Sequence, residues 1–308
     1  MRNRKQFGLI GKNIEYSFSK KYFLEKFNSD TNLSGYNYKN FDIESIDLIT
    51  GFISDKSLGG LNVTIPYKEE IIPYLDELSD EAREIGAVNT VCFENNKRKG
   101  YNTDIFGFTE SLRVNSINNI DTIIIMGTGG AAKTIIYFCK KNNIPYNILS
   151  RKKSKDYVSY KEINHSFFRG NVLIVNCTPV GTYPNIDKCP DIPYNLLNKK
   201  NNIPYKIVSR KKSNDYLSYK EINHSFLRGN VLIVNCTPVG TYPDIHKCPN
   251  LPYNLLNEDN ILYDLVYNPS ETLFIKKGKE MGCKTLNGYE MLKFQAEMSW
   301  NLWTKSTK

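Results

Sequence analysis

Short apolar runs alternate with segments of helical periodicity along most of the chain. The runs at 7–11 (FGLIG), 59–64 (GGLNVT) and 122–126 (TIIIM) have the length and composition of buried strands. After the first run, Phe23 and Phe27 share one face of a predicted helix. Strands that alternate with helices in this way predict an α/β fold.

Polar residues mark the predicted starts of several helices. We expect a helix to open at Pro66, with Thr64 or a neighbour as its cap, because proline is tolerated in a first helical turn. Ser19 and Asp104 are candidate caps for the helices that follow them. Taken singly, each of these polar residues is more typical of a cap than of a catalytic site.

Taken together, four polar clusters upstream of residue 105 favour a binding site. They supply hydroxyl and amide groups suited to a polyhydroxylated ligand, together with Lys68 and Asp104, a pair that can exchange a proton. The clusters are YSFS (16–19), NVTIPYK (62–68), AVNT (87–90) and NTD (102–104).

A glycine turn follows the strand at 122–126 and precedes a segment of helical spacing. Gly127, Gly129 and Ala132 fit G-x-G-x-x-A, in which the glycines permit a tight turn and the close approach of a pyrophosphate. A purely structural turn is the alternative. The strand and helix on either side favour a nucleotide site, with the phosphate at the helix N-terminus.

The next predicted strand (YNILS) ends in the basic stretch SRKKSK, which contains Arg151. An NAD site usually has Asp or Glu at this strand end, whereas a basic cluster suits a 2′-phosphate. The pattern therefore favours NADP, with a solvated basic turn as the alternative.

A tandem repeat interrupts this half of the chain. Residues 140–198 and 199–257 align without gaps and match at fifty of 59 positions, and both contain SRKKS and NVLIVNCTPVG. Three arrangements of the repeat stay open. Copy one packs into the domain while copy two lies outside it, copy two packs in while copy one lies outside, or the domain uses parts of both copies. Chain order favours copy one for the adenosine end of the cofactor through Arg151, and leaves the nicotinamide-side loop open between Thr178 and Thr237.

The composition is consistent with an α/β chain that binds a nucleotide. The chain has 308 residues, 40% of them hydrophobic, which suggests about two domains. The net charge is +9, but residues 199–257 alone hold nine basic and three acidic residues, so duplication explains much of it. No nucleic-acid motif accompanies the charge, and the apolar runs are too short to span a bilayer. The seven cysteines without C-x-x-C predict reduced thiols and no metal. The start MRNRKQFGLI passes from basic residues into an apolar strand without a signal-like stretch, and we therefore expect a cytoplasmic location.

With these motifs in place, the chain resembles the shikimate dehydrogenase family over nearly its whole length apart from one repeat copy. The matching motifs are S-x-S (17–19), N-V-T-x-P-x-K (62–68), G-A-V-N-T (86–90), G-x-N-T-D (100–104), G-x-G-G-A (127–131), D-L-x-Y-x-P-x-x-T (264–272) and N-G-x-x-M-L-x-x-Q-A (287–296).

The resemblance implies a function and a set of site residues. The family reaction is the reversible NADPH-dependent reduction of 3-dehydroshikimate to shikimate, on the way to chorismate and aromatic amino acids. Lys68 and Asp104 match the catalytic pair. The substrate-binding positions are Ser17, Ser19, Thr64, Asn89, Asp104, Tyr267 and Gln295. The cofactor-binding positions are Gly127, Thr128, Gly129, Gly130, Ala131, Ser150, Arg151, Lys152, Leu265 and Gly288.

The implied architecture has an N-terminal α/β substrate domain and a Rossmann-like NADP-binding domain that carries a duplicated strand-helix-strand segment. We place the substrate domain at 1–104, the NADP domain at 105–287, and a C-terminal helix that returns to the substrate domain at 288–308. The expected partners are small molecules, with no nucleic acid and no membrane, and the expected state is a monomer or homodimer.

Three departures from the family pattern bear on affinity and substrate choice. Tyr16 replaces a His or basic residue, Lys20 replaces a proline, and Ser150 replaces an asparagine. A quinate/shikimate dehydrogenase is therefore an alternative. A protein that binds NADP or shikimate without catalysis, its domain disrupted by the repeat, is a second alternative, and a basic nucleic-acid-binding module is a third.

Overall fold

The computed structural model describes residues 6–15, 17–95, 97–117, 120–150, 155–159, 162, 172–176, 208–209, 217–218, 222, 232–235, 245–264 and 271–305. The chain divides into two compact units. The first comprises 1–149, 173–177 and 291–308, and the second comprises 150–172 and 178–290. The functional boundaries at residues 104 and 287 stay a prediction.

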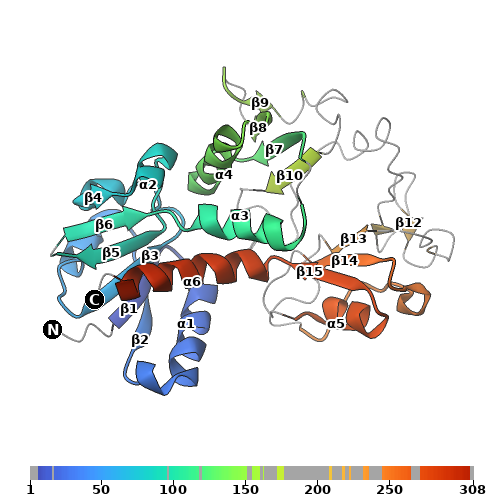
Figure 1. Ribbon diagram of the computed structural model, residues 1–308, viewed down its shortest axis with the longest axis horizontal. Coiled ribbons are helices and arrows are strands. Elements are labelled where there is room, and N and C mark those ends of the chain that lie inside the picture. The colour runs from blue at the N-terminus through green and yellow to red at the C-terminus, as the bar shows by residue number, and fades with distance from the viewer. Residues whose placement is uncertain are drawn as a thin grey trace. The chain divides into compact units, whose positions relative to one another are not determined.

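The first unit is built on a six-stranded mixed sheet (Figure 1). Its strands are β1 (Gln6–Gly11), β2 (Asn37–Asp42), β3 (Leu58–Val63), β4 (Glu77–Leu78), β5 (Thr90–Glu94) and β6 (Lys97–Tyr101). The order is β2-β1-β3-β5-β6-β4. β1 runs parallel to β2 and β3, whereas β5 is antiparallel to both β3 and β6. Three of the runs that the sequence predicts as strands are thus confirmed as β1, β3 and β7 (Thr122–Met126).

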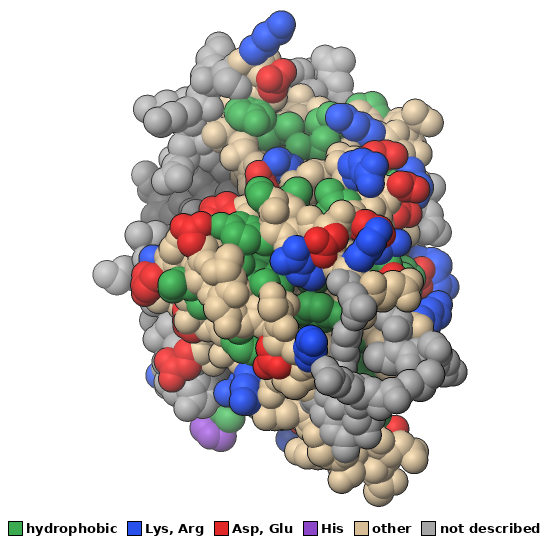
Figure 2. Space-filling model, turned by 90° about the vertical axis from the view of Figure 1, so that its left-hand side faces the viewer, with side chains coloured by type: hydrophobic (Ala, Val, Ile, Leu, Met, Phe, Trp, Pro, Cys, Tyr) green, Lys and Arg blue, Asp and Glu red, His purple; other side chains and the backbone are tan. Residues whose placement is uncertain are grey.

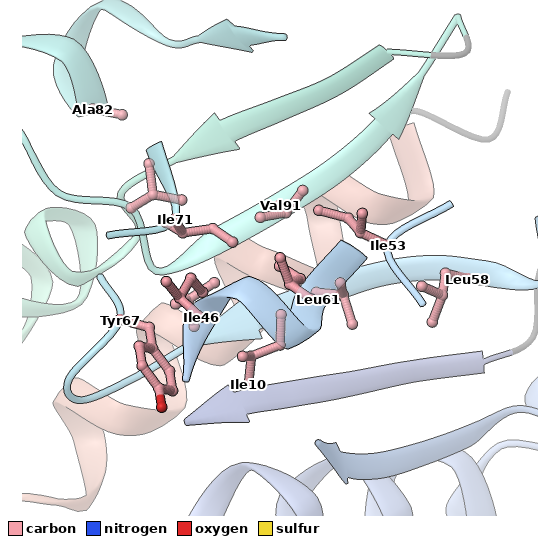
Figure 3. Close-up of a cluster of buried hydrophobic side chains, with 12 residues drawn as sticks. Ile10, Ile46, Ile53, Leu58, Leu61, Tyr67, Ile71, Ala82 and Val91 are labelled. Carbon is pink, nitrogen blue, oxygen red and sulfur yellow. The ribbon is translucent and has the colours of Figure 1, made fainter. Parts of the chain in front are cut away.

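Apolar clusters pack on both faces of this sheet. Successive side chains of a strand point to opposite faces, so neighbouring residues of one strand belong to different clusters. In β1, Phe7 and Leu9 belong to one apolar cluster and Ile10 to another. Figure 3 shows the second cluster, in which Ile10, Leu61 and Val91 meet side chains from the segment that follows β2. The first cluster is aromatic, and Phe7 lies 5.0 Å from the ring centre of Trp303.

Helices cover the sheet where the sequence places apolar residues at helical spacing. The helices of this unit are α1 (Phe18–Ser29), α2 (Asp80–Ile85), α3 (Asp104–Val114), α4 (Gly130–Lys141) and α6 (Tyr289–Lys305), with short 3₁₀ turns η1 (Thr31–Leu33), η2 (Ile46–Gly51) and η3 (Ile72–Tyr74), and α4 packs against β7 rather than on the six-stranded sheet. Phe23 and Phe27 are buried on α1, as their shared face predicts. Trp303 of α6 donates its indole N–H to the carbonyl of Val91 at 3.0 Å, which fixes this helix on β5.

The helix expected to open at Pro66 is not present. Pro66 follows a cis peptide bond, and the chain makes successive turns that lead into η3. The backbone N–H of Tyr67 bonds the carbonyl of Thr64 at 2.9 Å, three residues back, which is a turn rather than an α-helical bond. Apolar spacing and a tolerated proline were therefore insufficient evidence for a helix.

The glycine turn joins β7 to α4 within a parallel sheet. β8 (Tyr146–Ser150) pairs with β7 in parallel, and the order in this sheet is β10-β7-β8-β9, with β9 at Val158–Ser159 and β10 at Val172–Asn176. The three isoleucines of β7, at 123–125, are almost fully buried. Ala132, Ile135 and Cys139 are buried on α4 at helical spacing, as the sequence predicts.

The second unit contains a parallel sheet in the order β13-β14-β15. Its elements are β13 (Leu232–Asn235), β14 (Ile261–Asp264), β15 (Lys284–Asn287), α5 (Leu273–Glu280) and the 3₁₀ turn η9 (Tyr253–Leu255). Leu262 of β14 packs with Phe274 and Ile275 of α5. Thr272 caps α5 and donates its hydroxyl to Asp264, so both polar side chains are satisfied although fully buried.

The two repeat copies form the same short strand pair. In copy one, β8 neighbours β9, and in copy two, β11 (Val208–Ser209) pairs with β12 (Leu217–Ser218). The third strand of each copy has a different partner: β10 neighbours β7, whereas β13 pairs with β14. The helix expected inside each copy lies outside the described residues.

Basic and acidic side chains are interspersed on the face of the molecule shown in Figure 2. Ion pairs among the described residues include Lys97–Glu77 at 2.5 Å and Arg98–Asp76 at 2.7 Å. Across the described residues, the helices are too short or too polar to cross a membrane.

Candidate active site

The four polar clusters of the N-terminal half meet at one edge of the six-stranded sheet. β1, β3 and β6 end at this edge, and β5, which is antiparallel to β3 and β6, begins there. The register pairs Asn62 of β3 with Thr90 of β5, and Thr90 with Tyr101 of β6. Sequence segments that are far apart in the chain therefore present their polar groups together.

Lys68 and Asp104 form an ion pair at this edge. The Lys68 Nζ atom lies 2.5 Å from Oδ2 of Asp104, and the two side chains are only 19% and 13% exposed. Asp104 is the first residue of α3, where the helix dipole favours a negative charge. Partial burial strengthens the attraction, because less water screens it than at a surface pair. The pairing expected from the sequence is present in the geometry.

Asn89 holds the other oxygen of Asp104. Its Nδ2 donates to Asp104 Oδ1 at 2.8 Å, and its Oδ1 accepts from the backbone N–H of Thr103 at 2.7 Å. The same amide nitrogen lies 3.3 Å from Oε1 of Gln295 on α6. Both carboxylate oxygens of Asp104 are thus bonded, so its orientation is fixed before any ligand arrives.

Two cap assignments from the sequence are corrected by these bonds. Ser17, not Ser19, caps α1, since its hydroxyl oxygen accepts from the backbone N–H of Ser19 at 3.2 Å. At the start of α3, Asn102 Oδ1 accepts from the N–H of Ile105 at 3.3 Å, and the N-cap position is Thr103. Asp104 is therefore not used as a cap, and its carboxylate serves Lys68 and Asn89 instead.

Ser19 reaches the same region through a buried phenol. Burial raises the pKa of Tyr38 well above its usual value, while a hydrogen bond from Ser19 acts in the opposite direction. The neutral Tyr38 hydroxyl donates to Asn62 Oδ1 at 2.8 Å. Thr64 follows β3 directly and is half-buried. Thr64, which follows β3, therefore lies at the same end of the sheet as Asp104.

The glycine turn approaches the lysine of this pair. Gly127 has a φ of 106°, a conformation that glycine adopts without strain. A Cβ atom added to Gly130 would lie 3.1 Å from the Cβ of Lys68, so Gly130 and Lys68 are in close contact and a side chain there would displace Lys68 slightly. Thr128 and Gly129 belong to the same turn between β7 and α4, and Ala131 is the second residue of α4.

The start of α4 has the features expected of a phosphate site. Its N-cap is Gly129, which has no side chain that can accept from the first-turn N–H groups, and a Cβ atom there would meet no atom within 4 Å. An anion in this space would receive those N–H donors and the positive end of the helix dipole. The turn therefore fits the pyrophosphate of a dinucleotide.

The structure describes only some of the remaining residues that the sequence predicts for the cofactor and substrate sites. Ser150 ends β8, and the preceding Leu149 pairs with Met126 beside the glycine turn. Gly288 directly follows β15 in the second unit. The other predicted residues lie outside the described part of the chain, namely Arg151, Lys152, Leu265 and Tyr267, and so do Thr178 and Thr237.

The strand pairing bears on which repeat copy forms the cofactor site. β8 belongs to copy one and pairs with the glycine-turn strand β7, whereas β11, its equivalent in copy two, pairs with β12. This agrees with the preference for copy one at the adenosine end. The VLIVN strand beside β7 also comes from copy one, and the one beside β14 comes from copy two.

Sequence reasoning did not single out Ser299, which lies one turn beyond Gln295 on α6. It is fully buried and contacts Asn62, Thr90 and Thr103 through its hydroxyl. Its spacing of four residues from Gln295 was the available signal, because residues at i and i+4 share a helix face. A single serine among apolar neighbours is too common to be selected from the sequence.

Comparison with known proteins agrees with this arrangement. Residues 9–91 match the family model of the shikimate dehydrogenase substrate binding domain. The chain is 34% identical to a shikimate dehydrogenase (NADP(+)) of Methanococcus aeolicus, over 97% of this chain and 92% of that protein. It is also 34% identical to the corresponding enzyme of Clostridium beijerinckii, over 96% and 91% of the two chains.

Solved structures show the same relationship. The crystal structure of shikimate dehydrogenase 1 from Peptoclostridium difficile superposes with a TM-score of 0.62 at 31% identity, over 98% of this chain and 92% of that one. A shikimate dehydrogenase solved in complex with NADP+ gives a TM-score of 0.53 at 30% identity, over 98% and 90%. The fold, the polar sheet edge and this similarity over nearly the full length together show that the chain belongs to the shikimate dehydrogenase family.

Proposed function

We propose that this chain is an NADP-dependent shikimate dehydrogenase, which interconverts 3-dehydroshikimate and shikimate on the route to chorismate and aromatic amino acids. The observation that carries the proposal is the Lys68–Asp104 pair beside the glycine turn, with Gly130 packed against Lys68. The relatives of similar length are named as NADP-dependent shikimate dehydrogenases, which supports the same substrate and cofactor.

The glycine turn from Gly127 to Ala131 would hold the pyrophosphate of NADP, and Ser150, Arg151 and Lys152 would hold its adenosine end. NADPH, when bound, supplies the hydride for the reduction. A basic cluster at the end of β8 suits a 2′-phosphate better than the acidic residue of an NAD site would. Leu265 and Gly288 are the other proposed contacts of NADP.

Lys68 is the proposed proton donor. Reduction of a ketone places negative charge on its oxygen, and a nearby ammonium group stabilises that charge and transfers a proton to it. An ammonium group has three N–H donors, so the bond to Asp104 still leaves donors for a substrate oxygen. In the reverse direction the neutral amine accepts the proton of the alcohol.

Asp104 and Asn89 are proposed to orient the substrate ring. Because Asp104 is held by Lys68 and Asn89, its remaining lone pairs point in fixed directions and can accept from a ring hydroxyl. Gln295, Ser17, Ser19, Thr64 and Tyr267 would add further contacts to the hydroxyl and carboxylate groups of shikimate. The domain boundaries, a cytoplasmic location and the monomeric or homodimeric state stay predictions.

The direct test is the formation of NADPH by the purified chain with shikimate and NADP+, with NAD+ and quinate as competing cofactor and substrate. We expect shikimate with NADP+ to give the highest kcat/KM. Comparable rates with quinate would instead favour a quinate/shikimate dehydrogenase. A folded chain that binds NADP+ and shikimate in calorimetry but shows no turnover would contradict the reaction and favour a binding protein.

A further inference from the structure

A cluster of buried hydroxyl groups lies behind the ion pair. Thr90, Thr103 and Ser299 are each no more than 1% exposed. The Ser299 oxygen lies 2.8 Å from Oγ1 of Thr90 and 3.1 Å from Oγ1 of Thr103. The Ser299 hydroxyl on α6 therefore contacts both β5 and the start of α3.

The direction of the hydrogen bonds around Ser299 follows from the chemistry of its partners. The Nδ2 group of Asn62 can only donate, so the Ser299 oxygen accepts from it at 3.0 Å. The single proton of the Ser299 hydroxyl can be donated either to the carbonyl of Gln295 at 3.0 Å or to Oγ1 of Thr103 at 3.1 Å, and the second choice leaves the Thr103 hydroxyl free to donate to Asn89. Asn62 Oδ1 in turn accepts from Tyr38 at 2.8 Å. One side of the cluster therefore extends to Tyr38 on β2.

The other side of the cluster extends to the ion pair. The backbone N–H and the hydroxyl of Thr103 both bond Asn89 Oδ1, at 2.7 and 3.2 Å. Asn89 then donates to Asp104, which accepts from Lys68. Ser299 and Thr90 thus both connect Asn62 at one end to Asp104 at the other by continuous hydrogen bonds, because Asn62 also donates to Thr90 at 3.3 Å and Thr90 to Asn89 at 3.2 Å.

We propose that Ser299 is a positioning residue for the reaction, which sets the orientation of Asn89 and Asp104 through Thr103 and couples it to Tyr38 through Asn62. This inference rests on the proposed function. Ser299 lies behind Gln295 on α6, so it acts through other residues rather than by touching the substrate. Buried networks of this kind are cooperative, because each bond orients the next in a region with little water.

The test compares Ser299→Ala with Thr304→Val. Thr304 bonds the carbonyl of Trp300 at 2.9 Å, the same four-residue back-bond that Ser299 makes to Gln295, but it is half-buried and lies outside this cluster. We expect kcat to fall by about tenfold in Ser299→Ala, the usual effect of one buried hydrogen bond on a rate, and to change by less than about twofold in Thr304→Val. KM for NADP+ should stay unchanged in both.

A primary isotope effect separates positioning from stability. With shikimate deuterated at the reacting carbon, the isotope effect on kcat should increase in Ser299→Ala, because hydride transfer becomes a slower step. A loss of folded protein alone would leave the isotope effect of the remaining enzyme unchanged. Ser299→Cys fills nearly the same volume with a weaker donor, so its kcat should lie between those of Ser299→Ala and the wild type.

The outcomes are distinguishable. If Ser299→Ala folds with wild-type kcat and isotope effect, the positioning role is overturned while the proposed function stands. If Ser299→Ala does not fold, the same measurements are made on Ser299→Cys. A wild-type kcat and isotope effect in Ser299→Cys would then overturn the inference. A wild-type chain without dehydrogenase activity would overturn the proposed function and this inference together.

Discussion

At the scale of single residues, Asp104 is held on both sides before any substrate binds. Lys68 donates to one of its oxygens and Asn89 to the other. An active site gains rate when its groups need no rearrangement in the transition state. The structure indicates that the Asp104 carboxylate is such a preorganised group.

Replacing Asp104 with Asn tests its charge without a large change of shape. The amide cannot accept a hydrogen bond from both neighbours, since one end of it is a donor that faces either Lys68 or Asn89. We expect kcat/KM for shikimate to fall by about 100-fold or more, within the usual range for acid–base groups. Steady-state kinetics with circular dichroism as a folding control measure this, and activity within about twofold of wild type would exclude a role for the charge.

Asp76 provides a prediction for the pH dependence of stability. Hydrogen bonds from the Arg98 side chain, and then from its backbone N–H, hold the pKa of Asp76 well below its usual value. The stabilisation is fully present above the unfolded-state pKa of roughly 3.9 and is lost as the pH falls toward the folded-state pKa. The two side chains are each 34% exposed, so solvent screening limits the pair to about 1 kcal/mol or less.

Asp76→Asn should therefore lower the free energy of unfolding slightly at about pH 7, and make it fall less steeply between about pH 5 and 2 than in the wild type. Urea unfolding at several pH values measures both effects. The variant should keep its dehydrogenase activity, which makes it a control for Asp104→Asn. If the free energy of unfolding of the variant fell as steeply at low pH as that of the wild type, the Asp76–Arg98 pair would not contribute to the pH dependence of stability.

The residues of the site could be predicted to different extents from the sequence. Lys68, Asp104 and Asn89 occur in motifs with characteristic spacing, and the structure brings them together. Ser299 and Tyr38 could not be predicted, because they act through bonds between elements that are distant in the chain. A hydroxyl on a helix or strand carries no local signal of its tertiary partners.

At the scale of elements, β3 and α6 depend on a close contact between a glycine and a tryptophan. A Cβ atom at Gly60 would lie 2.2 Å from the indole nitrogen of Trp303, which donates to Val91. The contact brings α6, with Gln295 and Ser299, onto the sheet. Close packing at Gly60 is therefore needed to place the C-terminal helix behind the site.

Gly60→Ala should destabilise the chain by about 1–3 kcal/mol, because overpacking displaces Trp303 and weakens its bond to Val91. Gly51→Ala is the matched control, since a Cβ atom there meets no atom within 4 Å. Urea unfolding compares the two variants. Equal stabilities would show that α6 adjusts to the added methyl group without cost.

Strands were easier to predict than the segment after β3. The β7 run is a series of β-branched residues with a glycine turn behind it, and it forms a buried strand as expected. The segment at Pro66 has apolar residues that also fit a helix, but it forms turns and η3. Local spacing could not reveal this, because the bonds that replace the helix run to other elements, such as Val88 N–H to the carbonyl of Lys68.

At the scale of the whole molecule, the duplicated segment gives the chain two copies of one strand. β10 neighbours β7, and β13, with the same sequence, pairs with β14. A strand has two edges on which it can form a ladder. A single copy of this strand is therefore able to pair with both neighbours.

Deleting residues 199–257 tests whether one copy is sufficient. The deletion joins Asn198 to Glu258 and recreates the local sequence LLNED of the full chain. We expect the shortened chain to fold cooperatively and to keep its activity within about tenfold, since long insertions change loop-closure entropy only slowly. Deletion of 140–198 gives nearly the same sequence and should behave alike. A shortened chain that fails to fold would show that both copies are required.

The most direct test of the central claim is the activity of Lys68→Ala beside that of Lys97→Ala. Both lysines form ion pairs at 2.5 Å, but Lys97 pairs with Glu77 at an exposed position away from the site. We predict that Lys68→Ala loses about 1,000-fold in kcat for shikimate oxidation while it remains folded, whereas Lys97→Ala keeps wild-type kinetics. Equal activity of the two variants would contradict the assignment of Lys68 as the proton donor.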